Sequence, residues 1–459
     1  MNLFEGKVNI YFAGIGGIGM SALARYFLAG GYNVAGYDRT ESRLTGLLAE
    51  EGCIISYSDR VDSIPPQFMN REKTLVVYTP ALPATSAIRT FFSDEGYTVV
   101  KRSALLGLIS EHTLTVAIAG THGKTTISTL AAYLLKQSEV DCTAFLGGIS
   151  RNYDTNLLLG MGDYTVMEAD EFDRSFHALS PAVALITSMD PDHLEVYGTH
   201  QAMIEAYNIF ASRIREGGAL VVHSSVRHLV RDIEGVRIYT YGESEGDDFR
   251  LAEADSTGGN WKFTVAWPSG VIEDLTWSVP GRPNLLNAVA GISLALLSGV
   301  KPPEIVRSLP LFRGVVRRLD VRLQNDRIVY IDDYAHHPAE LDFLIRSVRE
   351  FYAGKIITAA FQPHLFTRTR DHAAAFAGSL DRVDRVFLLP VYPAREEPIK
   401  GVTSELIYKE MRLKDKMMVT PDELLEQLKL TETDVFITVG AGDIDRLTEP
   451  VIKILEERK

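Results

Sequence analysis

One short stretch of the chain combines the residue types that bind nucleotide phosphates. "VAIAGTHGKTTISTLAAYLL" predicts a buried strand, a glycine-containing turn and then a helix. Gly120 and Gly123 let the backbone curl so that its N–H groups face a phosphate, while Lys124 supplies positive charge and the Thr125 hydroxyl is a ligand for Mg²⁺. The usual pattern has one more glycine, where this chain has Ile118, so the loop is a compact form. The alternative is a tight turn with a surface lysine, but the flanking strand and helix favour an ATP site.

Acidic residues follow two later strands of the same block. "YTVMEADEFDRSF" is a buried strand that opens into acids, and "ALITSMDPDHLEVYG" is a strand followed by aspartates and a histidine. Charged groups after parallel strands lie where α/β proteins bind ligands, and Mg²⁺ prefers oxygen ligands. The sequence therefore predicts one or two Mg²⁺ ions here, although any single residue could instead be a solvated loop charge. The residues are Glu168, Asp170, Glu171, Asp173, Asp190, Asp192 and His193.

Another glycine loop stands near the start of the chain. In "FAGIGGIGMSALARYFLAGGYNVAGYD", Gly14, Gly16 and Gly19 have the spacing G-x-G-x-x-G after an apolar strand, and Asp38 ends the next strand. This pattern predicts a diphosphate at a helix N-terminus, with the acid near a ribose. Taken alone, it fits an NAD-dependent oxidoreductase as well as other enzymes that bind a nucleotide diphosphate.

The elements that must position these residues alternate along the whole chain. Apolar strands such as VNIYFA, TLTVAIAG and IVYIDDY are separated by helical stretches, which predicts α/β layers with largely parallel, buried strands. Residues 236–279 differ, because they read as antiparallel strands joined by Gly/Asp turns. A chain of 459 residues is too long for one core. Three successive blocks predict domains at 1–109, 110–312 and 313–459.

Composition excludes several classes of protein. The net charge of −13 argues against a general affinity for nucleic acid or for anionic membranes. The only two cysteines, Cys53 and Cys142, require no disulfide framework and fit a reducing compartment. No stretch approaches the roughly 20 apolar residues of a membrane span, and the first residues do not have the pattern of a signal peptide. We therefore expect a cytoplasmic protein, and leave monomer or homodimer open.

The motifs GTHGKTT, EADEFDRSF and DPDH, in this order and spacing, resemble those of the Mur ligase family, which forms amide bonds with ATP in peptidoglycan assembly. "DDYAHHPAEL" at 332–341, "FQPHLFTRTRD" at 361–371 and the opening GIGGIGMS are most similar to the branch that adds L-alanine to UDP-N-acetylmuramate. The resemblance is colinear over the chain. It implies three α/β domains: an N-terminal Rossmann-like UDP-binding domain, a central P-loop ATPase-like domain with a small antiparallel sheet, and a C-terminal Rossmann-like domain.

The resemblance also implies a reaction. The γ-phosphoryl group of ATP would pass to the lactyl carboxylate of UDP-N-acetylmuramate, and the amine of L-alanine would attack the acyl phosphate. Lys124, Glu168 and His193 would be catalytic, and Thr125, Glu168 and His193 would hold Mg²⁺, with Mn²⁺ as a substitute. The ATP-binding residues implied are Gly120, Thr121, His122, Gly123, Lys124, Thr125, Thr126, Asn284, Asn287, Arg318 and Asp333.

Two substrate sites complete the implied set. The first glycine loop would hold UDP rather than NAD, and a guanidinium such as that of Arg368 would bind the carboxylate of alanine. Two residues depart from the family pattern: Pro283 replaces a frequent histidine, and Leu365 replaces a frequent arginine. The implied UDP-sugar residues are Gly14, Gly16, Gly17, Ile18, Gly19, Met20, Ser21 and Asp38, and the implied amino-acid residues are Tyr334, His336, His337, His364 and Arg368.

Alternatives remain for single residues and for the whole function. Asn284 and Asn287 could simply cap their helix, and Arg317 beside Arg318 could form an ordinary surface ion pair. A ligase that adds a preformed tripeptide to UDP-N-acetylmuramate would share the loops but needs a roomier C-terminal pocket. An NAD-dependent oxidoreductase leaves the acids and histidines without roles, and a non-catalytic nucleotide-binding module would be expected to lose Lys124 or the acids. Residue spacing does not separate alanine from glycine or serine, since one small group is worth only about 1–3 kcal/mol.

Overall fold

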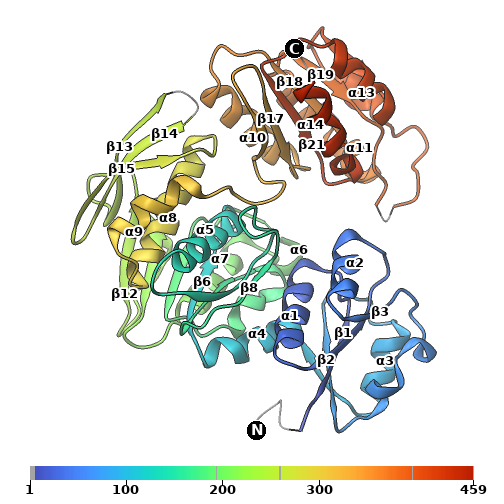
Figure 1. Ribbon diagram of the computed structural model, residues 1–459, viewed down its shortest axis with the longest axis vertical. Helices are drawn as coiled ribbons and strands as arrows, with labels where there is room; N and C mark the ends of the chain where they lie inside the picture. The colour runs from blue at the N-terminus through green and yellow to red at the C-terminus, as the bar shows by residue number, and fades with distance from the viewer. Residues whose placement is uncertain (1–5, 193, 258–259, 395, 458–459) are drawn as a thin grey trace. The chain divides into compact units, whose positions relative to one another are not determined.

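Three β-sheets follow one another along the chain (Figure 1). The computed structural model describes residues 6–192, 194–257, 260–394 and 396–457. It forms two compact units. Unit 1 is the chain through Glu253 with Phe263–Leu275 and Asn287–Phe312, and unit 2 is Ala254–Lys262, Thr276–Leu286 and the chain from Arg313 onward. The predicted α/β class is confirmed, while the predicted domain boundaries stay predictions.

The first sheet, in unit 1, is entirely parallel, with strand order β3-β2-β1-β4-β5. The chain moves from β1 to β2 on one side and returns to β4 on the other. The loop after β1 therefore lies at the point where the strand order reverses, where open α/β sheets bind ligands. The elements are β1 Asn9–Ala13, α1 Ile18–Ala29, β2 Asn33–Tyr37, α2 Arg43–Glu50, β3 Ile54–Ser56, β4 Thr74–Tyr78, α3 Ala87–Asp94, β5 Thr98–Lys101 and α4 Arg102–Glu111.

The second sheet has ten strands in the order β15-β14-β13-β12-β11-β10-β6-β9-β7-β8. β6 lies between β10 and β9 and is parallel to both, so the carboxyl ends of these three strands share one edge. The elements are β6 Leu114–Ala119, α5 Lys124–Lys136, β7 Cys142–Phe145, β8 Leu157–Leu158, β9 Tyr164–Glu168, β10 Val183–Ile186, α6 Leu194–Tyr197, α7 His200–Ala211, β11 Ala219–His223, β12 Arg237–Gly242, β13 Phe249–Thr257, β14 Asn260–Trp267, β15 Gly270–Trp277, α8 Arg282–Leu297 and α9 Pro302–Ser308.

The predicted small antiparallel sheet is an extension of this second sheet rather than a separate one. β12 pairs in parallel with both β11 and β13, so the predicted antiparallel arrangement is wrong for this strand, and β13 joins the larger sheet through it. β14 ends at Trp267 and its neighbour β15 begins at Gly270. Such a short connection between adjacent strands allows only an antiparallel pair.

One apolar core joins the first two sheets. It contains Phe12 and Leu23 from the first sheet and its helix α1, and Ala117 and Phe210 from the second sheet and its helix α7, all fully buried. Close-packed interiors resist displacement, because each side chain is held by its neighbours. The two glycine loops of unit 1 are therefore anchored on a single continuous core.

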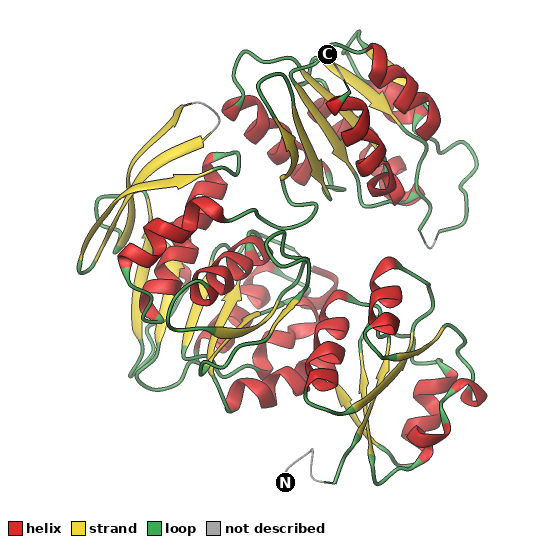
Figure 2. Cartoon of the chain, in the orientation of Figure 1, coloured by secondary structure: helices red, strands yellow, loops and turns green. Residues whose placement is uncertain are grey.

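The third sheet, in unit 2, has the order β16-β17-β21-β18-β19-β20, and only β16 is antiparallel to its neighbour. Helices flank its strands (Figure 2). Its core includes Tyr330, Phe387 and Phe436. Among the described residues, no helix has the length and apolar character needed to cross a membrane. The elements are β16 Asp320–Gln324, β17 Val329–Asp333, α10 Pro338–Phe351, β18 Ile357–Phe361, α11 Phe366–Leu380, β19 Arg385–Leu388, α12 Glu405–Glu410, β20 Lys416–Met418, α13 Pro421–Leu430, β21 Val435–Val439 and α14 Thr448–Glu456.

Candidate active site

The predicted phosphate loop connects β6 to α5. Gly120 and Gly123 have φ angles of +123° and +83°, in the left-handed region that favours glycine. A Cβ on Gly120 would overlap the Oγ1 atom of Thr187, so a larger residue does not fit there. Among the described residues no side chain caps α5, so the amides of its first turn, from Lys124 to Thr126, remain available to an anion.

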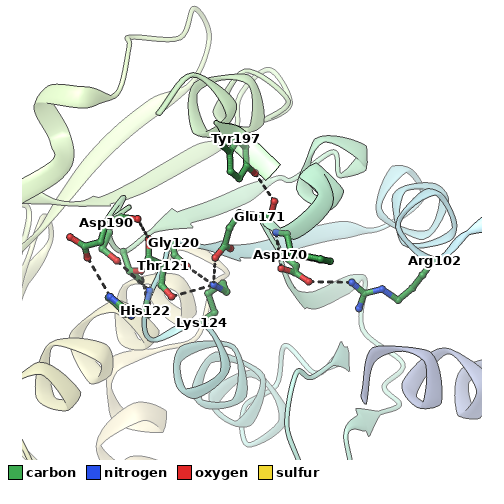
Figure 3. A network of polar contacts seen from close by, with 12 residues as sticks. Arg102, Gly120, Thr121, His122, Lys124, Asp170, Glu171, Asp190 and Tyr197 are labelled. Carbon is green, nitrogen blue, oxygen red and sulfur yellow. Dashed lines mark hydrogen bonds and ion pairs between the residues drawn. The ribbon is translucent and has the colours of Figure 1, made fainter. Parts of the chain in front are cut away.

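The loop after β10 braces the phosphate loop. Thr121 Oγ1 donates to the Asp190 carbonyl oxygen at 3.0 Å, and the His122 amide donates to Ser188 Oγ at 3.3 Å. Thr187 Oγ1 donates to the His122 carbonyl oxygen at 2.6 Å. The His122 ring also lies 3.5 Å from the Asp190 carboxylate, with both side chains mostly exposed (Figure 3). These contacts follow from the pairing of β6 with β10, which brings the two loops to the same edge of the sheet.

The acids that follow β9 are mostly paired with cations. Three of them contact three different basic side chains. The alternative of a solvated loop charge is wrong for Glu171, which is 2% exposed, and it stays open for Asp170 and Asp173, which are each 39% exposed. Glu168 differs, because it contacts no basic side chain among the described residues. The pairs are Asp170 with Arg102 at 3.3 Å, Glu171 with Lys124 at 2.8 Å, and Asp173 with Lys101.

Lys124 is held by acceptors inside the protein. Its Nζ donates to the carbonyl oxygens of Gly120 at 2.6 Å and Thr121 at 3.4 Å, and to Glu171 Oε1 at 2.8 Å (Figure 3). Glu171 is only 2% exposed, and among the described residues its Oε2 has no hydrogen-bond partner. Burial raises the pKa of Glu171, and the charge of Lys124 opposes that shift. The sequence had assigned Glu171 to the acidic group but to no specific role.

Glu168 lies at the end of β9, close to the first turn of α5. Its Oε1 accepts from the Gly147 amide at 3.1 Å and from Ser128 Oγ at 3.2 Å, and Ser128 Oγ also donates to the Thr125 carbonyl oxygen. Within the described residues, no hydrogen bond is made to Glu168 Oε2, so that oxygen is available to a cation. The carboxylate of Glu168 and the hydroxyl of Thr125 are the hard oxygen donors that Mg²⁺ prefers, so the residues present fit this ion.

The third predicted metal ligand, His193, lies outside the described residues. Among the residues that are described, no cluster of three or more His, Cys, Asp or Glu side chains has the arrangement of a metal site. The predicted ligands include a threonine hydroxyl, which is not among these side-chain types, and His193, which is not described. The predicted metal site therefore stays a prediction.

The first glycine loop is shaped by Asp38. Gly14 has a φ of +94°, and the Gly16 amide donates to Asp38 Oδ2 at 2.8 Å. The other carboxylate oxygen of Asp38 accepts from the Thr40 amide at 3.2 Å. Asp38 thus holds the loop in position, and its predicted proximity to the ribose or uracil stays a prediction. α1 begins after Gly17 with no capping side chain, so the amides from Ile18 to Met20 are available to an anion.

Ser21, predicted to contact the UDP-sugar, belongs to a buried network. Its Oγ donates to the Ile18 carbonyl oxygen at 2.9 Å and accepts from Asn156 Nδ2 at 2.9 Å. Arg25 donates to Asn156 Oδ1, so the network ties α1 to the loop before β8. Met20 is also buried, at 2% exposure. Ligand contacts by Ser21 and by the Met20 side chain stay predictions, and nothing in the local sequence signalled Asn156.

The two predicted adenine residues lie one turn apart at the start of α8. Asn284 Nδ2 donates to the Pro280 carbonyl oxygen at 2.8 Å. A helix cap needs a side-chain oxygen that accepts from an amide of the first turn, so this contact does not bear out the capping alternative. Asn287 lies against the phosphate loop, because a Cβ on Gly123 would be 2.6 Å from its Oδ1. Adenine contact stays a prediction for both residues.

In unit 2, residues predicted to bind the amino acid lie together. The ring centres of Tyr334 and His336 are 5.4 Å apart, and those of His336 and His364 are 5.9 Å apart. Arg368 Nη1 lies 3.4 Å from His364 Nδ1. Burial, and then the charges of His336 and Arg368, lowers the pKa of His364 to about 4. A neutral His364 accepts a hydrogen bond from Arg368 without repelling it.

His337 has a local structural role in addition to its predicted one. It is the N-cap of α10, and Glu340 Oε2 accepts from the His337 amide at 3.0 Å in a capping box. Its ring centre lies 5.1 Å from that of His372. Burial is the main cause that lowers the pKa of His337, with the charge of His372 adding to it. A contact between His337 and the amino acid stays a prediction.

Asp333, predicted to bind ATP, holds a strained turn. It ends β17, and its two carboxylate oxygens accept from the amides of Leu319 and Ala335, each at 2.7 Å. Arg317 and Leu319 have φ angles of +61° and +43°, which cost about 1–3 kcal/mol each for residues with side chains. Burial raises the pKa of Asp333, and these amides oppose the shift.

The two adjacent arginines of this turn differ in their contacts. Arg317 Nε lies 3.4 Å from the Asp332 carboxylate, and the two side chains are 13% and 1% exposed. The pair is therefore buried, and the alternative of an ordinary surface ion pair is wrong for Arg317. The guanidinium of Arg318 lies 5.7 Å from the ring centre of Tyr334. Arg318 therefore borders the cluster of Tyr334, His336 and His364, and its contact with ATP stays a prediction.

Three family models match nearly the whole chain. They are described as "Mur ligase family, catalytic domain" for residues 9–113, "Mur ligase middle domain" for residues 118–295, and "Mur ligase, glutamate ligase domain" for residues 317–442. The phosphate loop and the acids after β9 fall within the second match, and the histidine cluster of unit 2 within the third.

Full-length relatives have one specific name. UDP-N-acetylmuramate–L-alanine ligase of Parabacteroides distasonis is 49% identical over 447 residues, covering 97% of each chain, and that of Porphyromonas gingivalis is 48% identical over 450 residues, covering 97% of this chain and 99% of its own. The solved UDP-N-acetylmuramate-alanine ligase of Thermotoga maritima has a TM-score of 0.82 at 28% identity, covering 98% of this chain and 100% of its own. A murein peptide ligase from Psychrobacter arcticus shares the fold, with a TM-score of 0.68 at 20% identity and coverage of 98% and 99%.

Proposed function

This chain belongs to the Mur ligase family, and on that premise we propose that it joins L-alanine to the lactyl carboxylate of UDP-N-acetylmuramate. The reaction consumes ATP and releases ADP and phosphate, and it builds a precursor of peptidoglycan. The full-length identity to alanine ligases of two bacteria supports this choice within the family. The fold similarity to the tripeptide-adding type is weaker, so the alanine reaction is preferred.

The proposal rests on one observation: the carboxyl ends of β6, β9 and β10 meet at one edge of the second sheet. The loop after β6 offers free amides and Lys124, and the end of β9 offers the carboxylate of Glu168. ATP has to transfer its γ-phosphoryl group onto another anion, the lactyl carboxylate. Cationic groups and metal ligands at one place are what that transfer needs, because they offset the repulsion between the two anions.

Lys124 neutralises charge on the β- and γ-phosphates, and the amides of the first turn of α5 orient them. Thr125 and Glu168 hold Mg²⁺ or Mn²⁺, and His193 is assigned to a second ion by the family resemblance. When bound, such ions neutralise charge on the transferring phosphoryl group. Asn287 lies against this loop and is assigned to the nucleotide together with Asn284, Arg318 and Asp333.

Transfer of the γ-phosphoryl group converts the carboxylate into an acyl phosphate and releases ADP. The amine of L-alanine then attacks the carbonyl carbon, and the tetrahedral intermediate expels phosphate to leave the amide. Arg368 binds the carboxylate of alanine, since its planar fork matches a carboxylate and its neighbour His364 is neutral at physiological pH. Because ATP is a substrate, we assign the reaction to the cytoplasm.

The test is phosphate release from ATP and Mg²⁺ in the presence of UDP-N-acetylmuramate, with L-alanine, glycine, L-serine or the tripeptide added separately. Release that needs both the sugar nucleotide and L-alanine is the expected result. Release only with the tripeptide would move the enzyme to the recycling branch. Absence of release with every acceptor, together with tight binding of NAD, would overturn the proposal.

A further inference from the structure

A pocket of about 130 Å³ in unit 1 adjoins the first turn of α1, directly after the first glycine loop. The first turn of α1 lines the pocket, and so do the end of β9 and the residues after it. One cation also lines it, at the start of α4. Its lining residues include Ile18, Gly19, Arg102, Gly147, Glu168 and Asp170.

Arg102 lies directly over the first turn of α1. A Cβ on Gly19 would overlap its Nη1, so the glycine lets the guanidinium lie against this turn in the observed conformation. Its Nη2 lies 3.3 Å from Asp170 Oδ2, which is its only hydrogen bond within the described part of the chain (Figure 3). The side chain is 21% exposed. A guanidinium has five N–H donors, so most of those of Arg102 are available to a ligand in the pocket.

The first glycine loop lacks a cation of its own. Every side chain from Gly14 to Ser21 is uncharged, whereas the second loop contains Lys124. A helix N-terminus supplies only about half of a positive charge, which is less than a diphosphate needs. The nearby guanidinium matches phosphate oxygens in geometry and in charge. Arg102 can therefore neutralise a diphosphate at the first loop, as Lys124 is proposed to neutralise the phosphates of ATP at the second.

We propose that Arg102 binds the diphosphate of the sugar nucleotide, and that Asp170 is a positioning residue that holds the guanidinium across Gly19. The inference rests on the proposed function for the identity of the nucleotide. Asp170 and Glu171 are consecutive, and they hold Arg102 and Lys124 respectively. One short segment after β9 thereby positions the cation of each phosphate site.

The test compares the variants Arg102→Met and Arg102→Lys with wild type. Calorimetry would measure the Kd of UDP-N-acetylmuramate, UDP and ATP, and ligand-observed NMR would measure binding of uridine. Arg102→Met is expected to raise the Kd of both diphosphate ligands about 10- to 100-fold, as expected for loss of a charged hydrogen-bond donor. The Kd values of uridine and ATP should be unchanged, and Arg102→Lys should recover part of the loss.

A matched control is Arg60→Met, because Arg60 is 71% exposed and, within the described residues, its side chain pairs only with Asp62. It should change no Kd. If Arg102→Met does not fold, Asp170→Asn keeps the guanidinium and removes its anchor, and it should raise the Kd of the diphosphate ligands by a smaller factor. A loss of equal size for uridine and for the diphosphates would reduce Arg102 to a structural role and overturn the inference.

An unchanged Kd for UDP-N-acetylmuramate in Arg102→Met would also overturn the inference. The proposed function would survive that result, because wild type would still bind the sugar nucleotide and turn over with L-alanine. A wild-type protein that binds no UDP-sugar would instead refute the proposed function itself.

Discussion

Glutamine at position 171 tests whether the buried ion pair restrains Lys124. Glutamine keeps the shape of Glu171 and an oxygen that accepts from Lys124 Nζ, now 2.8 Å from Glu171 Oε1, but it removes the charge. A hydrogen bond between two charged groups is about twice as strong as a neutral one, so the contact weakens by about 1 kcal/mol. Bound phosphates compete with this carboxylate for Lys124. We therefore expect the Kd of ATP to fall about fivefold in Glu171→Gln.

The variant should lose some stability but stay folded. Glu171→Gln removes the desolvation cost of a carboxylate that is 2% exposed, but it leaves Lys124, which is 16% exposed, without an ionic partner. An unpaired buried charge costs about 3–5 kcal/mol, and the loss here should be smaller, because the carbonyl oxygens of Gly120 and Thr121 still accept from Lys124. The assays are calorimetric titration with ATP and thermal unfolding of the same samples.

Glu139→Gln is the matched control. The Lys301–Glu139 pair has the same 2.8 Å separation, but its side chains are 64% and 81% exposed. Water and salt screen such a pair, so its loss should affect neither ATP binding nor unfolding measurably. A fivefold weaker affinity for ATP in folded Glu171→Gln would refute the reasoning, because Glu171 would then position Lys124 for ATP.

The pH dependence gives a second readout. Because burial raises the pKa of Glu171, acidification protonates it at a higher pH than an ordinary glutamate. The protonated carboxyl no longer competes as an anion. The difference in ATP affinity between wild type and Glu171→Gln should therefore shrink as the pH is lowered, and a constant difference would argue against an ionised Glu171.

Three further predictions concern other parts of the site. Lys124→Ala should lower phosphate release about 100-fold or more without changing the Kd of UDP-N-acetylmuramate, and an active variant would reject the assignment of this loop to ATP. If the unpaired buried carboxylate of Glu171 unfolds the single variant, the double variant Lys124→Ala with Glu171→Gln keeps the test valid. Arg368→Ala should raise the KM for L-alanine about 10- to 100-fold with a smaller effect on kcat, and an unchanged KM would reject its role. Burial raises the pKa of Asp332 to about 7 from an ordinary value of 3.8, so between these pH values the folded protein keeps a proton that the unfolded chain loses. The contribution of Asp332 to the free energy of unfolding should therefore fall as the pH rises from about 4 to 7. Asp332→Asn should flatten that slope in urea unfolding at several pH values, and an unaltered slope would assign it to other groups.

Local sequence was sufficient to predict the backbone of the phosphate loops and the position of the acids at the sheet edge. The glycines of "GTHGKTT" adopt the backbone that the pattern predicts, with left-handed φ at Gly120 and Gly123. The acids after β9 lie beside this loop, as their position after a strand predicts, since β6 and β9 are parallel neighbours. Alternating strands and helices predicted the α/β class for the same reason: buried parallel strands are apolar throughout and are connected by helices.

Partners distant in sequence were decided only by the tertiary structure. The pairing of Glu171 with Lys124, and of Asp170 with Arg102, depends on which strands become neighbours, and residue types alone do not encode that order. The same holds for Ser21, which the sequence assigned to the ligand and which packing places against Asn156.

The sequence by itself therefore determined which segments have the backbone of a phosphate loop, since glycine, lysine and hydroxyl residues at fixed spacing act within a single turn of backbone. The tertiary structure decided which charges are free. After β9, the fold pairs Asp170, Glu171 and Asp173 with basic side chains. It leaves one carboxylate oxygen of Glu168 without a hydrogen bond from the described residues, so that oxygen is available to an ion. Burial and pairing set the availability of a charge, and both depend on contacts between residues far apart in the chain.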